Sequence, residues 1–166
     1  TKIRAEVYGK NINLQVPNDL PTVGADPTTI TEVLVNLIDN AIKYSANTDS
    51  SIDISAKLNE EGMIETTVKD YGEGVPESVM PHLFEKFSRN HRNKARVAGT
   101  GLGLYICKAI ISAHDGNISA RSKDGKGSEF SFTLHPYSVV ASQNPDDQSI
   151  IRTGHGWIKN HNLNRS

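Results

Sequence analysis

The sequence predicts an α+β fold, a two-layer sandwich in which a mixed, mostly antiparallel sheet packs against helices on one face. Three pairs of segments alternate apolar and polar residues with a period of two, which is typical of strands that bury one face. Two longer segments carry apolar residues at spacings of three and four, which is typical of amphipathic helices. These hairpins and helices alternate along the chain, an order that favours helices layered on a shared sheet.

The predicted elements begin with "KIRAEVYGKNINLQV", which reads as a hairpin of two strands, residues 3–7 and 12–16. A loop, "PNDLPTVGADP", follows. Asp26 then marks a helix start, because its side chain can cap the first turn and Pro27 lacks only an N–H that the first turn leaves unpaired.

The helix predicted over residues 28–45 has two different stripes. Asn36, Asn40 and Lys43 lie at positions i, i+4 and i+7 of one stripe. Asparagine is a mediocre helix former and its amide is costly to bury without partners, so this stripe needs a reason other than packing. The other stripe is apolar and consists of Ile30, Val33, Leu34, Leu37, Ile38, Ala41 and Ile42.

The remaining elements continue the alternation. "SIDISAKL" and "MIETTVKD" form a second predicted hairpin, and the loop "DYGEGVP" leads into a short amphipathic segment, "ESVMPHLFEKFSR". We expect "NHRNKARVAGTG" to be a mobile loop, because it is polar, basic and glycine-ended. A helix over residues 102–114 and a last hairpin, "NISARS" with "SEFSFTL", complete a domain that we assign to residues 1–136. Residues 137–166 have no clear period, so we expect a disordered or linker tail.

The composition argues against several classes of function. With 18 basic and 19 acidic side chains the net charge is −1, so the chain lacks the basic field typical of proteins that bind nucleic acid or anionic membranes. Cys107 is the single cysteine and cannot form an internal disulfide, which favours a reducing compartment. No apolar run approaches the ~20 residues that span a bilayer, and the N-terminus lacks a signal-peptide pattern. We therefore expect a cytoplasmic domain.

Two glycine motifs are ambiguous when each is taken alone. Gly99, Gly101 and Gly103 precede a helix, where backbone N–H groups can face a phosphate, but the same layout also suits a flexible hinge. The spacing is not that of a dinucleotide-binding fingerprint, and the lysine and hydroxyl residue of a P-loop are missing. "DYGEGVP", with Asp70 at the end of a strand, reads either as an ordinary turn or as a carboxylate at the bottom of a pocket for a flat ligand.

The order of the motifs is more specific than any one of them. The asparagine stripe with Tyr44, the "DYGEG" loop, "LFEKFSR" and "GTGLGL" resemble, in that order, the four nucleotide-binding motifs of sensor histidine kinases. These kinases belong to the gyrase, heat-shock chaperone and histidine kinase ATPase superfamily, whose Bergerat-type ATP-binding fold is a sandwich of the kind predicted. The resemblance covers residues 11–136, including "SKDGKGSEFSFTLHP", which is similar to the family's last hairpin.

The resemblance implies that the ligands are ATP and Mg²⁺. It makes Asn40 the Mg²⁺ ligand, and a neutral oxygen fits because Mg²⁺ takes few protein ligands and keeps phosphates and waters around it. Asn36 and Lys43 would contact the phosphates or their waters, and with Arg89 they are the candidate catalytic residues. Tyr44 would pack near the ribose and phosphates.

The same resemblance implies a base pocket and a lid. Asp70 would accept a hydrogen bond from the adenine amino group, an arrangement that disfavours the carbonyl of guanine. Gly72 and Gly74 would line the base pocket, while Leu83 and Phe87 would anchor a lid formed by "NHRNKAR". The other nucleotide-binding candidates are Gly99, Thr100, Gly101, Leu102, Gly103, Leu104 and Ser128.

Several of these roles have a plainer alternative. Phe84 and Phe87 suit the core better than a ligand contact, and Tyr44 could simply cover the end of its helix. The basic residues of the lid are either phosphate contacts or a solvated turn: Arg92, Lys94 and Arg96.

Asn36 favours a kinase over a hydrolase. Hydrolysing branches of the superfamily carry a glutamate at this position as general base, and an amide cannot accept a proton at neutral pH. A kinase must instead hold the γ-phosphoryl group away from water until its acceptor arrives.

The phosphoryl acceptor is missing from this sequence. In the family it is a histidine followed by an acidic residue and a proline on a dimerising helix, and none of the 6 histidines has that setting. We therefore expect the isolated catalytic domain of a two-component sensor histidine kinase. Its partners would be the dimerisation and phosphoacceptor domain and, indirectly, a response regulator. We expect the longer protein to be membrane-anchored, with no nucleic-acid or membrane contact from this domain. A non-catalytic ATP-binding regulatory module and a serine kinase on the same fold remain open.

Overall fold

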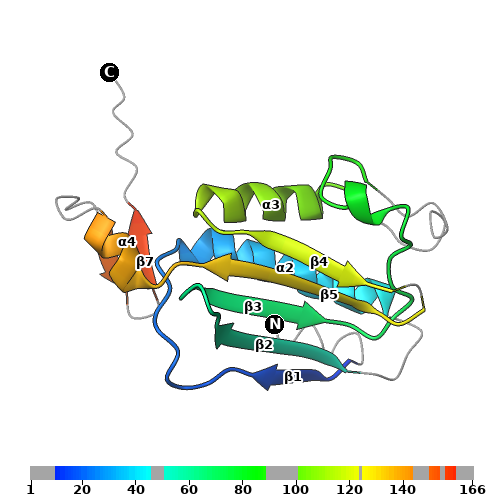
Figure 1. The fold of residues 1–166 in the computed structure, drawn as a ribbon, viewed down its shortest axis with the longest axis horizontal. Helices are drawn as coiled ribbons and strands as arrows, with labels where there is room; N and C mark the ends of the chain where they lie inside the picture. The colour runs from blue at the N-terminus through cyan, green and yellow to red at the C-terminus, as the bar shows by residue number, and fades with distance from the viewer. Residues whose placement is uncertain are drawn as a thin grey trace.

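The computed structural model describes residues 10–45, 51–88, 101–123, 125–143, 150–153 and 156–159. Its centre is a five-stranded sheet with the strand order β1-β2-β3-β5-β4 (Figure 1). The strands are β1 (Ile12–Gln15), β2 (Ile52–Leu58), β3 (Ile64–Lys69), β4 (Ile118–Ser122) and β5 (Ser128–Leu134). Two helices, α2 (Pro27–Tyr44) and α3 (Gly103–Ala113), cover one face of this sheet, which confirms the predicted two-layer sandwich.

The sheet is mixed, as predicted, because one pair of neighbouring strands is parallel. β1 runs parallel to β2, with Ile12 opposite Ile52, whereas the other neighbours are antiparallel. The two later hairpins, β2 with β3 and β4 with β5, are confirmed. Residues 3–7, the other half of the predicted first hairpin, lie outside the described residues, so that pairing stays a prediction.

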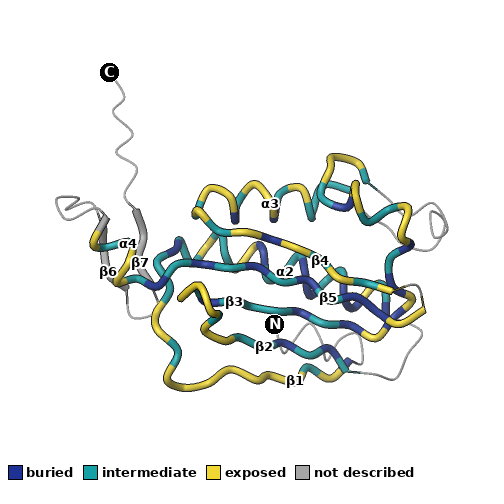
Figure 2. Tube along the Cα trace, viewed as in Figure 1, coloured by how far each residue is buried: buried dark blue, intermediate teal, exposed yellow. Residues whose placement is uncertain are grey.

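Helix α2 begins where the sequence predicts it. Asp26 is the N-cap, and its Oδ1 accepts a hydrogen bond from the Thr28 N–H at 2.9 Å, with Pro27 in the first turn. The apolar stripe of α2 packs into the core, which it shares with α3 and the helix-facing side chains of the strands (Figure 2). The buried core residues are Ala25, Val33, Leu37, Ile38, Ala41, Ile42, Ile52, Ile54, Val68, Leu83, Cys107, Ile111, Ile118, Phe130, Phe132 and Leu134.

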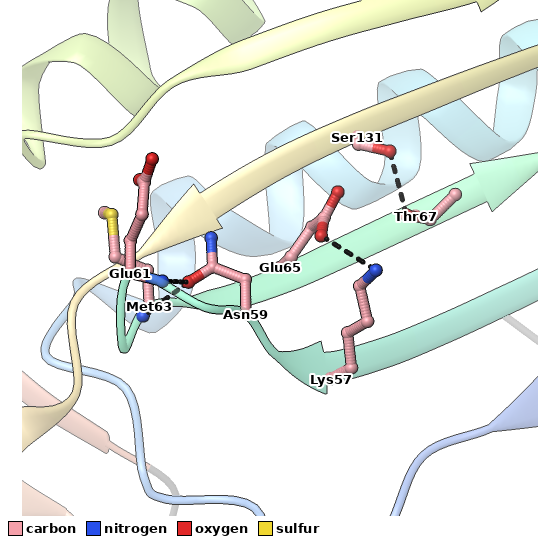
Figure 3. Close-up of polar contacts among 7 residues, drawn as sticks. All are labelled: Lys57, Asn59, Glu61, Met63, Glu65, Thr67 and Ser131. Carbon is pink, nitrogen blue, oxygen red and sulfur yellow. Dashed lines mark hydrogen bonds and ion pairs between the residues drawn. The ribbon is translucent and has the colours of Figure 1, made fainter.

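The other face of the sheet carries polar side chains. The hydroxyls of Thr67 on β3 and Ser131 on β5 are hydrogen-bonded at 2.8 Å, and Lys57 on β2 pairs with Glu65 on β3 at 3.3 Å (Figure 3). At the turn of this hairpin the Asn59 side chain accepts two backbone N–H groups (Figure 3). The sheet therefore buries one face only, as its alternating pattern predicts. We call this polar side the open face.

Shorter elements lie outside the sandwich. The segment that follows the "DYGEGVP" loop contains one 3-10 turn, and beyond β5 come a helix and a separate antiparallel pair of strands. They are η1 (Met80–His82), α4 (Tyr137–Gln143), β6 (Ile150–Thr153) and β7 (Gly156–Lys159).

The chain after β5 first packs back onto the segment before α2. Pro136 forms an isolated bridge with Val23, and its carbonyl oxygen accepts the N–H groups of Val139 and Val140 at 3.0 and 3.3 Å. Residues 137–143 form the helix α4, whereas the sequence predicts a disordered or linker tail from residue 137 onward. The domain boundary at residue 136 stays a prediction.

Candidate functional site

The carboxylate of Asp70 is buried at the end of β3, beside the first residue of β5. Asp70 is 2% exposed and Ser128 is 5% exposed. Their backbones exchange two hydrogen bonds, from the Asp70 N–H to Ser128 O at 2.9 Å and from the Ser128 N–H to Asp70 O at 3.3 Å. The Gly72 N–H donates to Asp70 Oδ1 at 2.9 Å, which fixes the direction of the carboxylate. Two predicted site residues that are far apart in the sequence thus lie side by side.

The environment of Asp70 penalises its charge. Burial raises the pKa of Asp70 above its ordinary value, and the hydrogen bonds from Gly72 and Ser128 oppose this rise. Among the described residues no cation is paired with this carboxylate, so its burial costs free energy, and groups of this kind cluster at functional sites. Asp70 therefore has the properties of a residue retained for binding.

A serine on β4, Ser122, holds the turn that follows Asp70 through hydrogen bonds. Ser122 Oγ accepts the Val75 N–H at 2.7 Å, donates to Gly127 O at 2.8 Å and lies 3.2 Å from Ser128 Oγ. Gly127 packs so closely that a Cβ there would lie 2.1 Å from Asp70 O. Sequence reasoning missed Ser122 and Gly127 as supporting residues, and the second glycine of "KDGKG" was the one available signal.

The turn after β3 also packs against the C-terminal end of α2. A Cβ on Gly72 would lie 2.2 Å from Tyr44 O, so only glycine fits this contact. The Glu73 N–H donates to the same oxygen at 3.3 Å. The next carbonyl oxygen, that of Ser45, accepts a hydrogen bond from the buried Lys10 Nζ at 2.6 Å, and a cation is favourable at this end of a helix. The predicted base pocket thus adjoins the end of the asparagine helix.

The polar stripe of α2 stays out of the core, as the sequence predicts. Asn36 and Asn40 are half-buried and Lys43 is exposed, whereas most of the apolar stripe beside them is buried. Asn36 lies against the start of α3, because a Cβ on Gly103 would be 3.1 Å from Asn36 Oδ1. The middle of α2 therefore meets the glycine-containing loop.

The N-terminal end of α3 has the features of an anion site. Leu102 occupies the N-cap position, and a leucine has no side-chain oxygen to accept the N–H groups of the first turn. Gly101 has a φ of 71°, and its carbonyl oxygen accepts the Phe87 N–H at 3.0 Å. The N-terminal end of α3, which is the positive end of its dipole, therefore lies between Asn36 and the segment that contains Phe87.

These contacts join the described parts of the four motifs into one continuous series. It begins at the junction of β3 and β5, continues to the end of α2, follows α2 to its middle, and passes through the glycine loop to the segment before it. The residues in that order are Ser128, Asp70, Gly72, Tyr44, Asn36, Gly103, Gly101 and Phe87.

Some predicted residues lie elsewhere. Leu83 is buried in the core and Leu104 packs against it. Phe84 packs edge-on against Phe130, with ring centroids 6.5 Å apart, which confirms its core role. Phe87 is 71% exposed, so the core interpretation is wrong for this residue. Arg89, Gly99, Thr100, Arg92, Lys94 and Arg96 lie outside the described residues.

The donor set suits a metal ion that is held mainly by its ligand. Within the described ranges no group of three or more His, Cys, Asp or Glu residues could hold a metal ion. Asn40, half-buried on the polar stripe, offers one neutral oxygen. That is enough for Mg²⁺ only when phosphates and waters complete its octahedron, so the residues present fit a metal–nucleotide complex.

The sequence matches a known protein family and several sensory kinases. The family described as "Histidine kinase-, DNA gyrase B-, and HSP90-like ATPase" matches residues 25–138. The adaptive-response sensory kinase SasA of Synechococcus sp. (strain JA-2-3B'a(2-13)) is 40% identical over 136 residues, which cover 80% of this chain and 35% of that kinase. SasA of Crocosphaera subtropica is 42% identical over 122 residues, which cover 74% of this chain and 31% of that kinase. The chain thus spans about a third of the length of these relatives.

Several solved structures with the same fold are histidine kinases. Full-length ShkA in complex with AMPPNP has a TM-score of 0.69 and 28% identity, covering 81% of this chain and 28% of ShkA. The nucleotide-free catalytic domain of the histidine kinase ThkA has a TM-score of 0.66 and 27% identity, covering 80% of this chain and 84% of that domain. The chain therefore belongs to the histidine kinase-, DNA gyrase B- and HSP90-like ATPase family and is a histidine kinase-type ATPase catalytic domain.

Proposed function

We propose that this chain binds Mg·ATP and transfers the γ-phosphoryl group to a histidine on a separate dimerisation domain of a two-component sensor kinase. The observation that carries the proposal is the series of contacts from Asp70 through α2 to the start of α3. The similarity to SasA kinases and to a kinase solved with AMPPNP supports it.

Asp70 selects adenine in this proposal. One carboxylate oxygen accepts the Gly72 N–H, and an ionised carboxylate has further lone pairs that can accept the adenine amino group. A guanine carbonyl at that position would face a carboxylate, and the repulsion disfavours GTP. Gly72, Gly74 and Ser128 form the surroundings of the base: the two glycines let the turn pack closely against neighbouring backbone, and Ser128 has a small side chain.

The start of α3 and the polar stripe of α2 hold the phosphates. The first-turn N–H groups of α3 and its dipole attract the negative charge, and Lys43 adds a full positive charge. Tyr44 lies beside the ribose and phosphates, while Arg89, Gly99 and Thr100 act from the lid and loop. Asn40 is the ligand for Mg²⁺, which neutralises phosphate charge when bound.

Asn36 makes the reaction a transfer and not a hydrolysis. Its amide offers no base to activate water, so the γ-phosphoryl group waits for an acceptor imidazole. As the phosphorus–nitrogen bond forms, the bond to the β-phosphate oxygen breaks and ADP leaves. Such a reaction needs mainly positioning and charge neutralisation, which Lys43 and the start of α3 supply.

The partner in this proposal is the dimerisation and phosphoacceptor domain, and a response regulator then receives the phosphoryl group. We place the domain in the cytoplasm, joined through that partner to a membrane anchor in the longer protein. In the part of the chain that the structure describes, no helix has the length and apolarity needed to cross a membrane.

A phosphotransfer assay tests the proposed function. The chain is mixed with γ-labelled ATP, Mg²⁺ and the dimerisation domain of a similar kinase, and we expect label on that domain that is stable in alkali and lost in acid, as phosphohistidine is. The Asn40→Ala variant should transfer little label, because the Mg²⁺ complex loses its protein ligand.

The other outcomes identify the rival functions. Acid-stable label would indicate a serine kinase on the same fold. ATP binding without label on any acceptor domain would favour a non-catalytic regulatory module and contradict the proposal.

A further inference from the structure

Tyr71 lies between the proposed adenine carboxylate and Gly72, yet its side chain points the other way. Asp70 is 2% exposed on the helix side, whereas Tyr71 is 40% exposed and reaches across the open face. Its hydroxyl donates a hydrogen bond to Asp53 Oδ2 on β2 at 2.6 Å. Neighbouring residues of one extended segment thus face opposite sides of the sheet, one toward the site and one toward an anchor.

Asp53 is itself held in place. Its other oxygen, Oδ1, accepts hydrogen bonds from Asn13 Nδ2 at 2.9 Å and from Ser51 Oγ at 3.2 Å. The hydrogen bond from Tyr71 is the main reason why the pKa of Asp53 lies below its ordinary value, with further lowering by Asn13, Ser51 and Lys69, while burial opposes the shift. Asp53 is therefore a charged and oriented acceptor for the phenol.

Two more contacts fix the ring and backbone of Tyr71. Lys69 Nζ lies 5.2 Å from the centroid of the Tyr71 ring, within the range of a cation–π contact. On the backbone side a Cβ on Gly127 would lie 2.7 Å from Tyr71 Cα, so the chain is packed closely there. Residue 71 is thus clamped between the open face and the β4–β5 hairpin.

We infer that Tyr71 is a positioning residue, which through its bond to Asp53 holds the Asp70–Gly72 turn in the geometry that adenine requires. This inference rests on the proposed nucleotide function. Rotation about the backbone of residue 71 would turn the carboxylate of Asp70 and the N–H of Gly72 relative to each other, and the anchor opposes that rotation. The exposed ring contributes little to the core, so its hydroxyl can be removed without unfolding the chain.

Calorimetric titration with ATP and with inosine triphosphate tests this role. Inosine triphosphate has an oxygen in place of the adenine amino group, so it cannot donate to Asp70. We expect Tyr71→Phe and Asp53→Ala each to weaken ATP binding about threefold to tenfold, the loss of one hydrogen bond's net contribution. Inosine triphosphate binding should change less, so the preference for ATP falls. The double variant should bind ATP no more weakly than the single variant with the lower ATP affinity, because both substitutions remove the same hydrogen bond.

Two further variants separate positioning from a general loss of stability. Asp53→Asn should retain most of the ATP affinity, because an amide can still bond with the phenol. Thr67→Val removes another hydroxyl bond of the open face, the 2.8 Å contact of Thr67 on β3 with Ser131 on β5 (Figure 3), and should leave ATP affinity and preference unchanged.

Unchanged ATP affinity or preference in Tyr71→Phe, or an equal loss in Thr67→Val, would overturn the positioning role while leaving the proposed function intact. Absence of ATP binding by the unsubstituted chain would overturn both.

Discussion

At the scale of single residues, the site contains side chains that lower the stability of the fold. Asp70 is the clearest, because burial raises its pKa and no cationic side chain is paired with it among its described contacts. Cys107 shows the contrast. Burial, with the nearby charge of Glu32, raises the pKa of its thiol to about 12, so it stays neutral and packs as an apolar residue.

Asp70→Asn should weaken ATP binding and strengthen the fold. We expect about a tenfold or greater loss of ATP affinity by calorimetry, because a charge-assisted hydrogen bond to adenine is removed. The Asn side chain keeps an oxygen for the Gly72 N–H, so the turn is retained. Unchanged ATP affinity would remove Asp70 from the base site.

The stability of that variant should depend less on pH. Because the pKa of Asp70 is raised on folding, the unfolded chain loses this proton first, and the free energy of unfolding falls as pH rises from the ordinary value of 3.8 through the raised value. Urea unfolding at about pH 4 and pH 7.5 should show that Asp70→Asn removes this component. A variant less stable than the unsubstituted chain at neutral pH would contradict the account.

At the scale of elements, hydrogen bonds of one histidine, His114, connect the start of α2 with the end of α3. The Asp26 backbone N–H, at the start of α2, donates to His114 Nε2 at 3.2 Å, so this nitrogen carries no proton. His114 Nδ1 then carries the proton and donates to Ile110 O at 2.8 Å, near the end of α3. This link sets the start of α2 against the end of α3, at the opposite end of α3 from the candidate phosphate site.

His114→Ala should lower the free energy of unfolding by about 1–2 kcal/mol, because a partly buried N–H loses its acceptor. Urea unfolding measures this loss, and the ring ¹⁵N shifts of the unsubstituted chain should show the neutral Nδ1–H form. His82→Ala is the matched control, since the His82 side chain is exposed and its one described polar contact is with the exposed Glu85 carboxylate at 3.0 Å. That change should stay within about 0.5 kcal/mol. Equal losses in both variants would exclude the link.

At the scale of the whole molecule, local sequence patterns predict the helices and strands, but they do not predict which of these elements lie side by side. The apolar spacing of α2 and the alternation of its neighbouring hairpins follow from side-chain periodicity, which the sequence displays directly. The parallel pairing of β1 with β2 depends on strand order in space, which no local pattern contains. The same limit explains Tyr71, whose link to Asp53 exists only because β3 lies beside β2.

The candidate site follows the same rule. The order of the motifs in the sequence identifies the site residues, but it does not predict which motifs contact each other. The contact of Asn36 with Gly103, for example, depends on how α3 packs on α2. Apolarity alone predicts a core position for Phe87, yet its backbone has a φ of 61° and its ring faces solvent. Residue type indicates which side chains tend to be buried, whereas backbone direction decides which ones are.

The most direct test of the central claim is an amide ¹⁵N–¹H NMR titration of this chain with Mg·ATP. We expect shifts concentrated at Tyr44, Gly72 and Gly103, where the parts of the site meet, with little change at Ser55 and Thr67 on the open face. Shifts confined to the open face, or no shifts at saturating nucleotide, would contradict it.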